Sequence, residues 1–186
     1  FDVILCDVPC SGDGTCRKDR HILSSWKPNI GNELHETQLA ILKRGIELLK
    51  PNNGRLCYST CSMNPVENEA VVAAALQTFD TVELVDIIIE DIIQGVELQD
   101  GLSHWKVAEY SDREDDDEDD DTGEATRLTW WSTVSEAVSA NKKKLSSSLW
   151  PPLKGQHELP LSKCKRLWPQ EQDSGGFFLA VLRKRD

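Results

Sequence analysis

The chain has 186 residues, of which 39% are hydrophobic and 28% are charged, a composition that indicates a folded domain and excludes an intrinsically disordered chain. No apolar run approaches the roughly 20 residues that a membrane-spanning helix needs, so no membrane partner is expected. The formal net charge is −11, but residues 109–124 hold eleven acidic residues and one arginine and therefore carry −10 of it.

The first part of the chain alternates short apolar runs with longer polar or amphipathic segments. Residues 1–6 are apolar and β-branched and predict a buried strand that ends at Asp7. Residues 8–32 are rich in Gly, Ser, Asp and Pro and predict a long functional loop. Apolar residues at helical spacing predict a helix over residues 33–50, and a turn then leads into a second strand over residues 55–59.

A second helix is expected to begin at Pro65. Asn64 can cap it, proline suits the first helical position, and Glu67 can complete a capping box. The Ala/Val run over residues 70–76 continues this helix. Three later strands are predicted over residues 82–85, 105–108 and 177–182. The strand–helix–strand–helix order predicts parallel strands with crossover helices, which is an α/β fold.

The acidic segment and the basic segment that follows it have opposite charge. Residues 109–126 predict a disordered surface insertion, with an acidic tether or a mimic of nucleic acid as the alternative. Residues 141–186 hold ten Lys or Arg and four Asp or Glu, a local charge of +6 that is compatible with RNA binding. The basic run at residues 142–144 suits phosphate contacts or a nuclear signal.

Two of the six cysteines follow the first two predicted strands. Cys10 lies in the sequence DVPCSGDGT and Cys61 in YSTCSMNP. Ligands of such a sheet bind beyond the carboxyl ends of its strands, where Asp7 also falls. Cys61 also precedes the helix expected from Pro65, and a helix N-terminus favours a thiolate. Two thiols at one rim therefore suggest an enzyme that forms a covalent bond with its substrate.

Other roles for the cysteines stay open at this point. Cys6, Cys57 and Cys164 are best explained as small buried hydrophobes, and the same explanation remains open for Cys10 and Cys61. A zinc site would use pairs four residues apart, but an extended strand separates such a pair by roughly 13 Å, too far for one ion. A redox pair would need cysteines closer in sequence, and the setting favours a reducing, intracellular compartment.

Histidines and tryptophans give weaker signals. None of the four histidines has the context of a catalytic triad, and His35 is expected at the surface or boundary of its helix. Trp130, Trp131, Trp150 and Trp168 would either stack on bases or pack a C-terminal subdomain against the sheet.

The chain resembles the Sun-domain RNA cytosine-5 methyltransferases, most closely the eukaryotic branch that modifies tRNA. The segments that carry the resemblance are DVPCSGDGT (7–15), KRGIELLK (43–50), GRLCYSTCSMNPVENEAVV (54–72), HWKV (104–107) and SGGFFLAVL (174–182). The resemblance covers the chain apart from the acidic block. It implies the C-terminal half of a Rossmann-like class I methyltransferase sheet, a tRNA partner, a monomer without a metal, and a nuclear location, with nucleolus and cytoplasm as alternatives.

The resemblance also implies roles for three residues. Cys61 would attack carbon 6 of cytosine, because the resulting enamine-like ring can accept a methyl group on carbon 5. Cys10 would help to release the enzyme after methylation. Asp7 would hydrogen-bond the base and lie near the methionine end of S-adenosylmethionine, the implied methyl donor. A base in a duplex or structured RNA would have to be flipped out.

In the family, a glycine-rich cofactor loop, an acidic ribose ligand and a lysine precede DVPCSG, and this chain contains none of them. We therefore expect the chain alone to be inactive and the parent protein to extend at its N-terminus. On this view residues 1–108 form the C-terminal half of the catalytic domain, 109–126 the insertion, and 127–186 a basic part whose strand 177–182 returns to the sheet. The alternative is an inactive remnant that binds RNA or protein.

Overall fold

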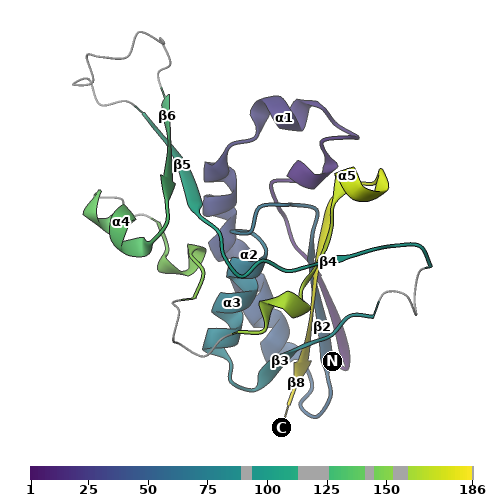
Figure 1. Ribbon diagram of the computed structural model, residues 1–186. Coiled ribbons are helices and arrows are strands. Elements are labelled where there is room, and N and C mark those ends of the chain that lie inside the picture. Colours follow the sequence, from purple (N-terminus) through teal and green to yellow (C-terminus); the bar gives the residue numbers. More distant parts are fainter. Residues whose placement is uncertain (89–93, 113–125, 141–144, 153–158, 186) are drawn as a thin grey trace.

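The computed structural model describes residues 1–88, 94–112, 126–140, 145–152 and 159–185 (Figure 1). The basic run at 142–144 and residues 113–125 of the acidic segment lie outside these ranges. The α/β class predicted from the sequence is confirmed, because helices pack on a mixed sheet. Within the described ranges, none of the helices combines the length and the apolar character needed to cross a bilayer.

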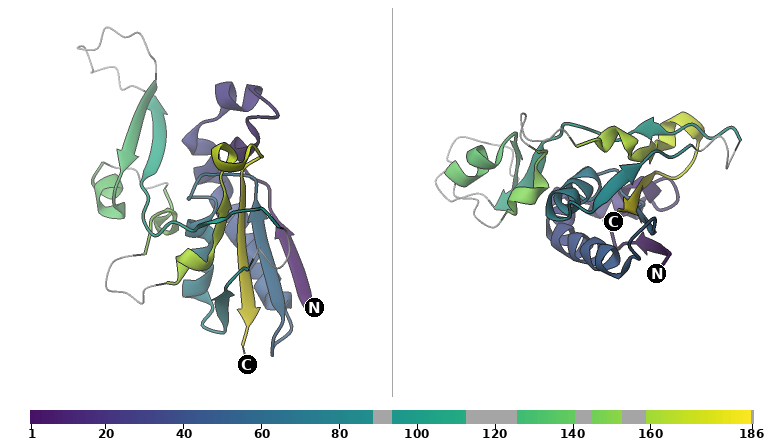
Figure 2. Two further views of the ribbon diagram at one scale, coloured as in Figure 1. Left: turned by 45° about the vertical axis from the view of Figure 1, so that its right-hand side comes forward. Right: turned by 90° about the horizontal axis from the view of Figure 1, so that it is seen from below.

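The sheet has its last strand near its centre. Its strands are β1 (Val3–Asp7), β2 (Arg55–Thr60), β3 (Val82–Val85), β4 (Gln99–Asp100), β7 (Lys165–Leu167) and β8 (Phe177–Lys184). They run in the order β1–β2–β8–β7–β4, and β3 pairs with β8 as well. The left view of Figure 2 shows β1 in purple, β2 in blue and β8 in yellow side by side. Only β1 and β2 are parallel; β8 is antiparallel to β2, β7 and β3, so the expectation of parallel strands holds only for the first pair.

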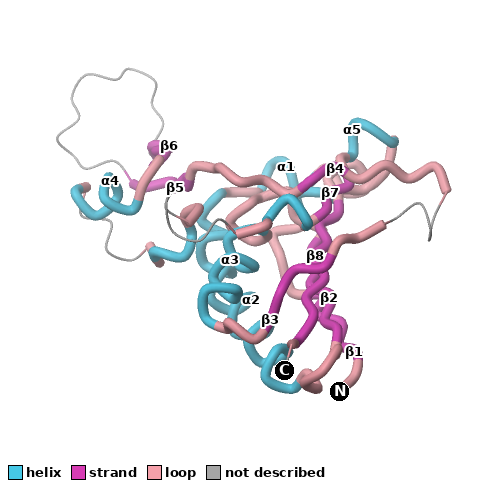
Figure 3. The backbone as a smooth tube through the Cα atoms, turned by 60° about the horizontal axis from the view of Figure 1, so that its bottom comes forward, coloured by secondary structure: helices cyan, strands magenta, loops and turns pink. Residues whose placement is uncertain are grey.

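Two helices, α2 (Pro28–Leu48) and α3 (Glu69–Thr78), lie side by side against the sheet (Figures 1 and 3). α2 buries Leu42 and Ile46 completely. A Cβ atom at Gly45 would lie 2.6 Å from Leu56 Cδ1, so glycine lets the helix approach β2 closely. The shorter elements are η1 (Asp13–Thr15), α1 (His21–Ser25), α4 (Val134–Ser139), η2 (Ser147–Leu149), η3 (Leu161–Lys163) and α5 (Pro169–Gln172).

The start of α2 differs from the prediction. The helix begins at Pro28 rather than at residue 33, and η1 and α1 lie within the predicted loop 8–32. The composition of residues 8–32 favours a loop, and glycine at position 31 lowers the propensity for a helix. Packing explains this glycine, because a Cβ atom there would lie 2.3 Å from Asn64 Nδ2.

The start of α3 also differs. The helix begins at Glu69, and the residues from Pro65 onward form turns instead. Asn64 does act locally, since its Oδ1 accepts a hydrogen bond from the Val66 N–H at 3.1 Å. The predicted capping box does not form, because the Glu67 carboxylate is used elsewhere, by groups of the two cysteine loops.

Beside the main sheet stands an antiparallel hairpin of β5 (Val107–Asp112) and β6 (Thr126–Trp131). Of the segment 109–126 predicted to be disordered, residues 109–112 and 126 belong to these strands and residues 113–125 lie outside the described residues. The strand predicted over residues 105–108 lies further along the chain, at Val107–Asp112.

Side chains of α2 hold this hairpin in place. Asn29 accepts a hydrogen bond from the Tyr110 N–H at 2.7 Å and donates one to the Tyr110 carbonyl at 3.0 Å, as a neighbouring strand would. Asn32 donates to the Ala108 carbonyl at 2.8 Å. These hydrogen bonds satisfy backbone groups of β5, so the first residues of the acidic segment can lie in a strand.

His35 is fully buried, which corrects the expected surface or boundary position. Its Nδ1 lies 2.8 Å from the Val66 carbonyl oxygen and its Nε2 lies 2.7 Å from Ser148 Oγ. The ring therefore links α2 to the turn after β2 and to η2. Burial lowers the pKa of His35 below its ordinary value, so the folded protein holds the ring in its neutral form.

Stability should consequently fall as the pH drops below about 6.5, where the unfolded chain binds a proton that folded His35 refuses. The slope attributable to this group is at most about 1.4 kcal/mol per pH unit. Urea unfolding of the full-length protein at pH 7.5 and 5.5 measures it. His35→Gln should flatten the slope, whereas the exposed His21→Gln should not. Equal slopes in the two variants would contradict the assignment.

Candidate active site

The two cysteine motifs meet where β1 and β2 end side by side. Asp7, the last residue of β1, pairs in register with Ser59 of β2. The loops that follow bring Cys10 Sγ within 3.3 Å of Cys61 Sγ. Neither thiol belongs to a disulfide. The structure therefore brings together the residues singled out in the sequence, although Cys10 and Cys61 are 51 positions apart.

Close backbone contacts, rather than a helix terminus, position Cys61. The Gly14 N–H donates to the Cys61 carbonyl at 2.9 Å, and the Gly176 N–H donates to the Gly14 carbonyl at 2.7 Å. A Cβ atom at Gly14 would lie 2.5 Å from the Cys61 oxygen, so only glycine fits there. Because α3 begins at Glu69, the argument that a helix N-terminus adjoins Cys61 does not hold.

The carboxylate of Glu67 ties the two cysteine loops together. Its Oε1 accepts a hydrogen bond from the Ser11 N–H at 2.7 Å, and its Oε2 accepts from the hydroxyls of Ser11 and Ser62 at 2.6 and 2.8 Å. Gln38 also donates to Oε1, at 3.1 Å. Ser11 follows Cys10 and Ser62 follows Cys61, so one fully buried carboxylate sets the spacing of both thiols.

Sequence reasoning assigned Glu67 to a helix cap and so missed this role. The usable signal was the serine after each cysteine, because hydroxyl groups that are buried or half-buried require hydrogen-bond partners.

Asp7 lies beside the thiols but in a more open position. Its Oδ1 accepts a hydrogen bond from the Ser59 hydroxyl at 2.8 Å, and the residue is exposed. A carboxylate in this setting can accept further hydrogen bonds from a ligand, such as a base amine or an ammonium group.

The surroundings of Cys10 hold its thiol in the neutral form. Burial, and then the neighbouring Cys61 sulfur, raise the pKa of Cys10 to about 12. Cys10 therefore keeps its proton at neutral pH and can donate a hydrogen bond to the Cys61 sulfur. An attacking thiol must be a thiolate, so Cys10 is poorly suited to attack a substrate.

A buried ion pair between Arg166 and Glu69 supports the loop after β2. Arg166 of β7 donates from Nε to Glu69 Oε1 at 2.6 Å and from a guanidinium nitrogen to the Met63 carbonyl at 2.9 Å. The same Glu69 oxygen accepts the Leu102 N–H at 2.8 Å. Both charged side chains are fully buried. Nothing in the sequence pointed to this pair, since its members lie 97 positions apart.

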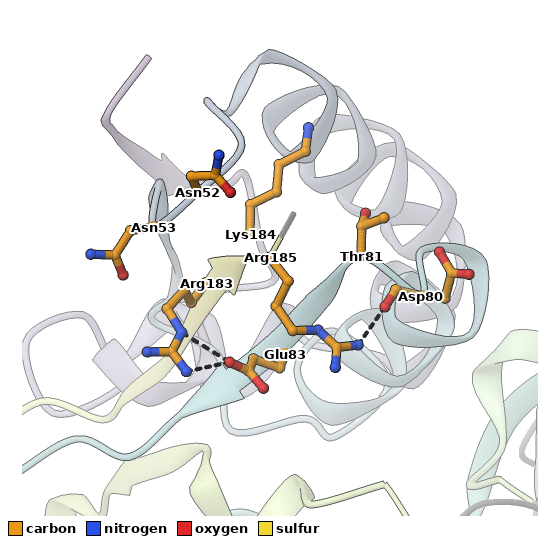
Figure 4. Close-up of a pocket in the computed structure, with 8 residues that line it drawn as sticks. All are labelled: Asn52, Asn53, Asp80, Thr81, Glu83, Arg183, Lys184 and Arg185. Carbon is orange, nitrogen blue, oxygen red and sulfur yellow. Dashed lines mark hydrogen bonds and ion pairs between the residues drawn. The ribbon is translucent and has the colours of Figure 1, made fainter.

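A cavity of about 720 Å³ lies at the C-terminal end of β8, away from the cysteine loops (Figure 4). Its cations are already engaged. Arg183 pairs with Glu83, Arg185 donates to the Asp80 carbonyl, and Lys184 donates to two carbonyls at the end of α2. The fold thus uses these charges, and we assign no ligand to this cavity.

Comparison with known proteins agrees with the site. The profile of a family described as 16S rRNA methyltransferase RsmB/F matches residues 1–117. The chain is 41% identical over 185 residues to a multisite-specific tRNA:(cytosine-C(5))-methyltransferase of Saccharomyces cerevisiae, covering 99% of the chain and 23% of that protein. It is 39% identical over 187 residues to a tRNA (cytosine(34)-C(5))-methyltransferase of Drosophila melanogaster, covering 100% of the chain and 23% of that protein. The chain thus spans about a quarter of these relatives.

Solved structures share the fold. A methyltransferase homolog from Pyrococcus horikoshii is 25% identical, with a TM-score of 0.56 over 99% of this chain and 39% of that one. NSun6 from the same organism, solved with SFG, is 19% identical, with a TM-score of 0.51 over 97% of this chain and 29% of that one. With a family profile that matches more than half of its residues and a cysteine pair at the expected strand ends, the chain belongs to the RsmB/F family of Sun-domain methyltransferases.

Proposed function

We propose that the protein containing this chain methylates carbon 5 of cytosine in RNA, with tRNA as the substrate class. The observation that carries the proposal is the pair of thiols 3.3 Å apart at the ends of two parallel strands. The names of the yeast and fly relatives support tRNA, because both describe tRNA cytosine-C5 methyltransferases.

In this proposal Cys61 forms a bond to carbon 6 of the base. Nucleophilic addition makes carbon 5 electron-rich enough to take a methyl group. Asp7 accepts a hydrogen bond from the base amine and so orients the ring for the addition. Cys10 holds its proton beside the Cys61 sulfur until the thioether has formed. Cys10 then gives its proton to solvent, and as a thiolate it takes the proton from carbon 5 while the carbon 5–carbon 6 double bond re-forms and Cys61 leaves as a thiolate.

The residues of this chain fit one side of a site for S-adenosylmethionine. Asp7 offers an exposed carboxylate at the end of β1, which suits the ammonium group of the methionine end. When bound, S-adenosylmethionine supplies the methyl group. In agreement with a larger parent domain, β1 is an edge strand whose Val3 and Leu5 are 66% and 78% exposed. We propose that further strands pair with β1 at this edge and that another element of the parent domain covers the face that carries Val3 and Leu5.

The test uses the full-length protein and a tRNA transcript that contains 5-azacytidine. The nitrogen at position 5 prevents release, so an active enzyme should form a protein–RNA complex that survives denaturing electrophoresis. Methyl transfer from labelled S-adenosylmethionine to unmodified tRNA should accompany it. RNA binding without adduct and without methyl transfer would reject the proposal in favour of a binding module.

A further inference from the structure

A cavity of about 440 Å³ lies beside the cysteine site, a size suited to a small organic group. It is enclosed by the start of α2, the turn after β2, residues 102–108 and the end of β6. Its lining includes the three indole rings of Trp26, Trp105 and Trp130 together with Met63. So many aromatic rings from separate elements around one open cavity call for a ligand with a flat apolar face.

The cavity shares a wall with the cysteine site. The Trp26 indole N–H donates to Ser11 Oγ at 3.1 Å, and Ser11 follows Cys10. Met63, two positions after Cys61, donates its N–H to Asp13 Oδ1 at 2.8 Å. A group bound in the cavity would therefore be separated from the reacting base by the width of these side chains.

The tryptophans present ring surface rather than free polar groups. The Trp26 N–H is bonded to Ser11, and the Trp105 N–H donates to the Leu149 carbonyl at 2.7 Å. Trp130 is 58% exposed, which is unusual for so large a hydrophobic side chain. Its ring therefore remains available to a ligand.

The polar groups of the cavity suit a nucleotide. Lys106 and His104 line it and are exposed, so a phosphate can reach them. The one carboxylate in the lining, Asp13, already accepts the Met63 N–H. Asn32 also lines the cavity, and its Nδ2 is already bonded to the Ala108 carbonyl.

We propose that this cavity holds a nucleobase adjacent to the target cytosine, stacked on Trp130, with its phosphate near Lys106. The inference rests on the proposed RNA methylation. It adds a second contact that helps to keep the target base extruded, because single-stranded bases stack on aromatic side chains. The RNA concentration needed for reaction should therefore depend on Trp130, whereas the chemistry at Cys61 should not.

The test compares Trp130→Ala with Val138→Ala in the full-length protein, since Val138 is similarly exposed, at 53%, on α4 and lies outside the cavity. The readout is the concentration of 5-azacytidine tRNA that gives half-maximal adduct. Trp130→Ala should raise it about tenfold or more and leave the adduct at saturating RNA unchanged. Val138→Ala should match the wild type.

A second arm locates the base. Wild-type protein should lose the same factor with RNA that is abasic at one nucleotide next to the target, and Trp130→Ala should show no further loss with that RNA. Equal half-maximal concentrations for Trp130→Ala and wild type, or fully additive losses, would overturn the proposal. Absence of adduct in every protein, wild type included, would instead reject the methylation itself.

Discussion

Replacing Cys10 with alanine in the full-length protein should trap the enzyme on ordinary tRNA, whereas replacing Cys61 should abolish every covalent complex. The two sulfurs are 3.3 Å apart, and burial beside Cys61 keeps Cys10 protonated at neutral pH. In the proposed mechanism Cys61 is the attacking group. Without Cys10 the adduct still forms and accepts the methyl group, but it lacks the neighbour that assists elimination, so the complex accumulates.

Denaturing electrophoresis with labelled tRNA measures both effects. We expect methylated product to fall at least 100-fold in either variant, a loss typical of removing an acid–base group or a nucleophile. Cys57→Ala provides a control, since Cys57 is a free cysteine of β2, the strand that precedes Cys61, and belongs to neither cysteine loop. If Cys61→Ala keeps the adduct on 5-azacytidine RNA and Cys10→Ala removes it, the two roles are reversed.

Replacing Arg166 with methionine should destabilise the protein by about 3–5 kcal/mol, because it leaves the buried charge of Glu69 without a partner. Methionine retains much of the apolar volume beside Phe178, so the loss of charge dominates. The Met63 carbonyl also loses its donor. The Leu102 N–H stays bonded to Glu69, but this carboxylate no longer has its arginine partner. The loop after Cys61 should therefore loosen together with one wall of the aromatic cavity.

Urea unfolding followed by tryptophan fluorescence measures this change. Arg183→Met is a matched control, because Arg183 forms an ion pair with Glu83 in which the side chains are 43% and 33% exposed. Its loss should cost less than about 1 kcal/mol. Replacing Arg166 and Glu69 together by apolar residues should recover much of the stability. Equal effects of the two arginine variants would show that burial of the first pair has no special cost.

The strand ends that carry the site could be predicted from the sequence. Short apolar runs stop at Asp7 and near Cys61, and the carboxyl ends of parallel neighbours meet at one edge of a sheet. That geometry places the two cysteine loops at one edge, and the hydrogen bonds of Glu67 then set the spacing of the thiols. The start of α2 could not be predicted, because Gly31 weakens a helix locally and is required only by contact with Asn64.

The charged support of the site was also beyond sequence reasoning. Glu67 and Glu69 lie two positions apart at the start of α3, in a segment that resembles an ordinary capping sequence. Burial of an ionised group is costly unless partners come from distant segments, and local patterns do not contain that information. Ser11 and Arg166 are those partners, and only the folded chain brings them to the two carboxylates.

The place of β8 in the sheet has a consequence for how the protein is made. β8 lies between β2 on one side and β3 and β7 on the other. Leu56 of β2 therefore gains its partner Leu182 only when β8 has joined the sheet. Closing so long a loop is slow compared with forming α2 and the β1–β2 pair. Gly176, which holds Gly14 and through it Cys61, arrives with the same strand. On the ribosome, the reactive thiols should stay loosely held until residues 176–184 have emerged.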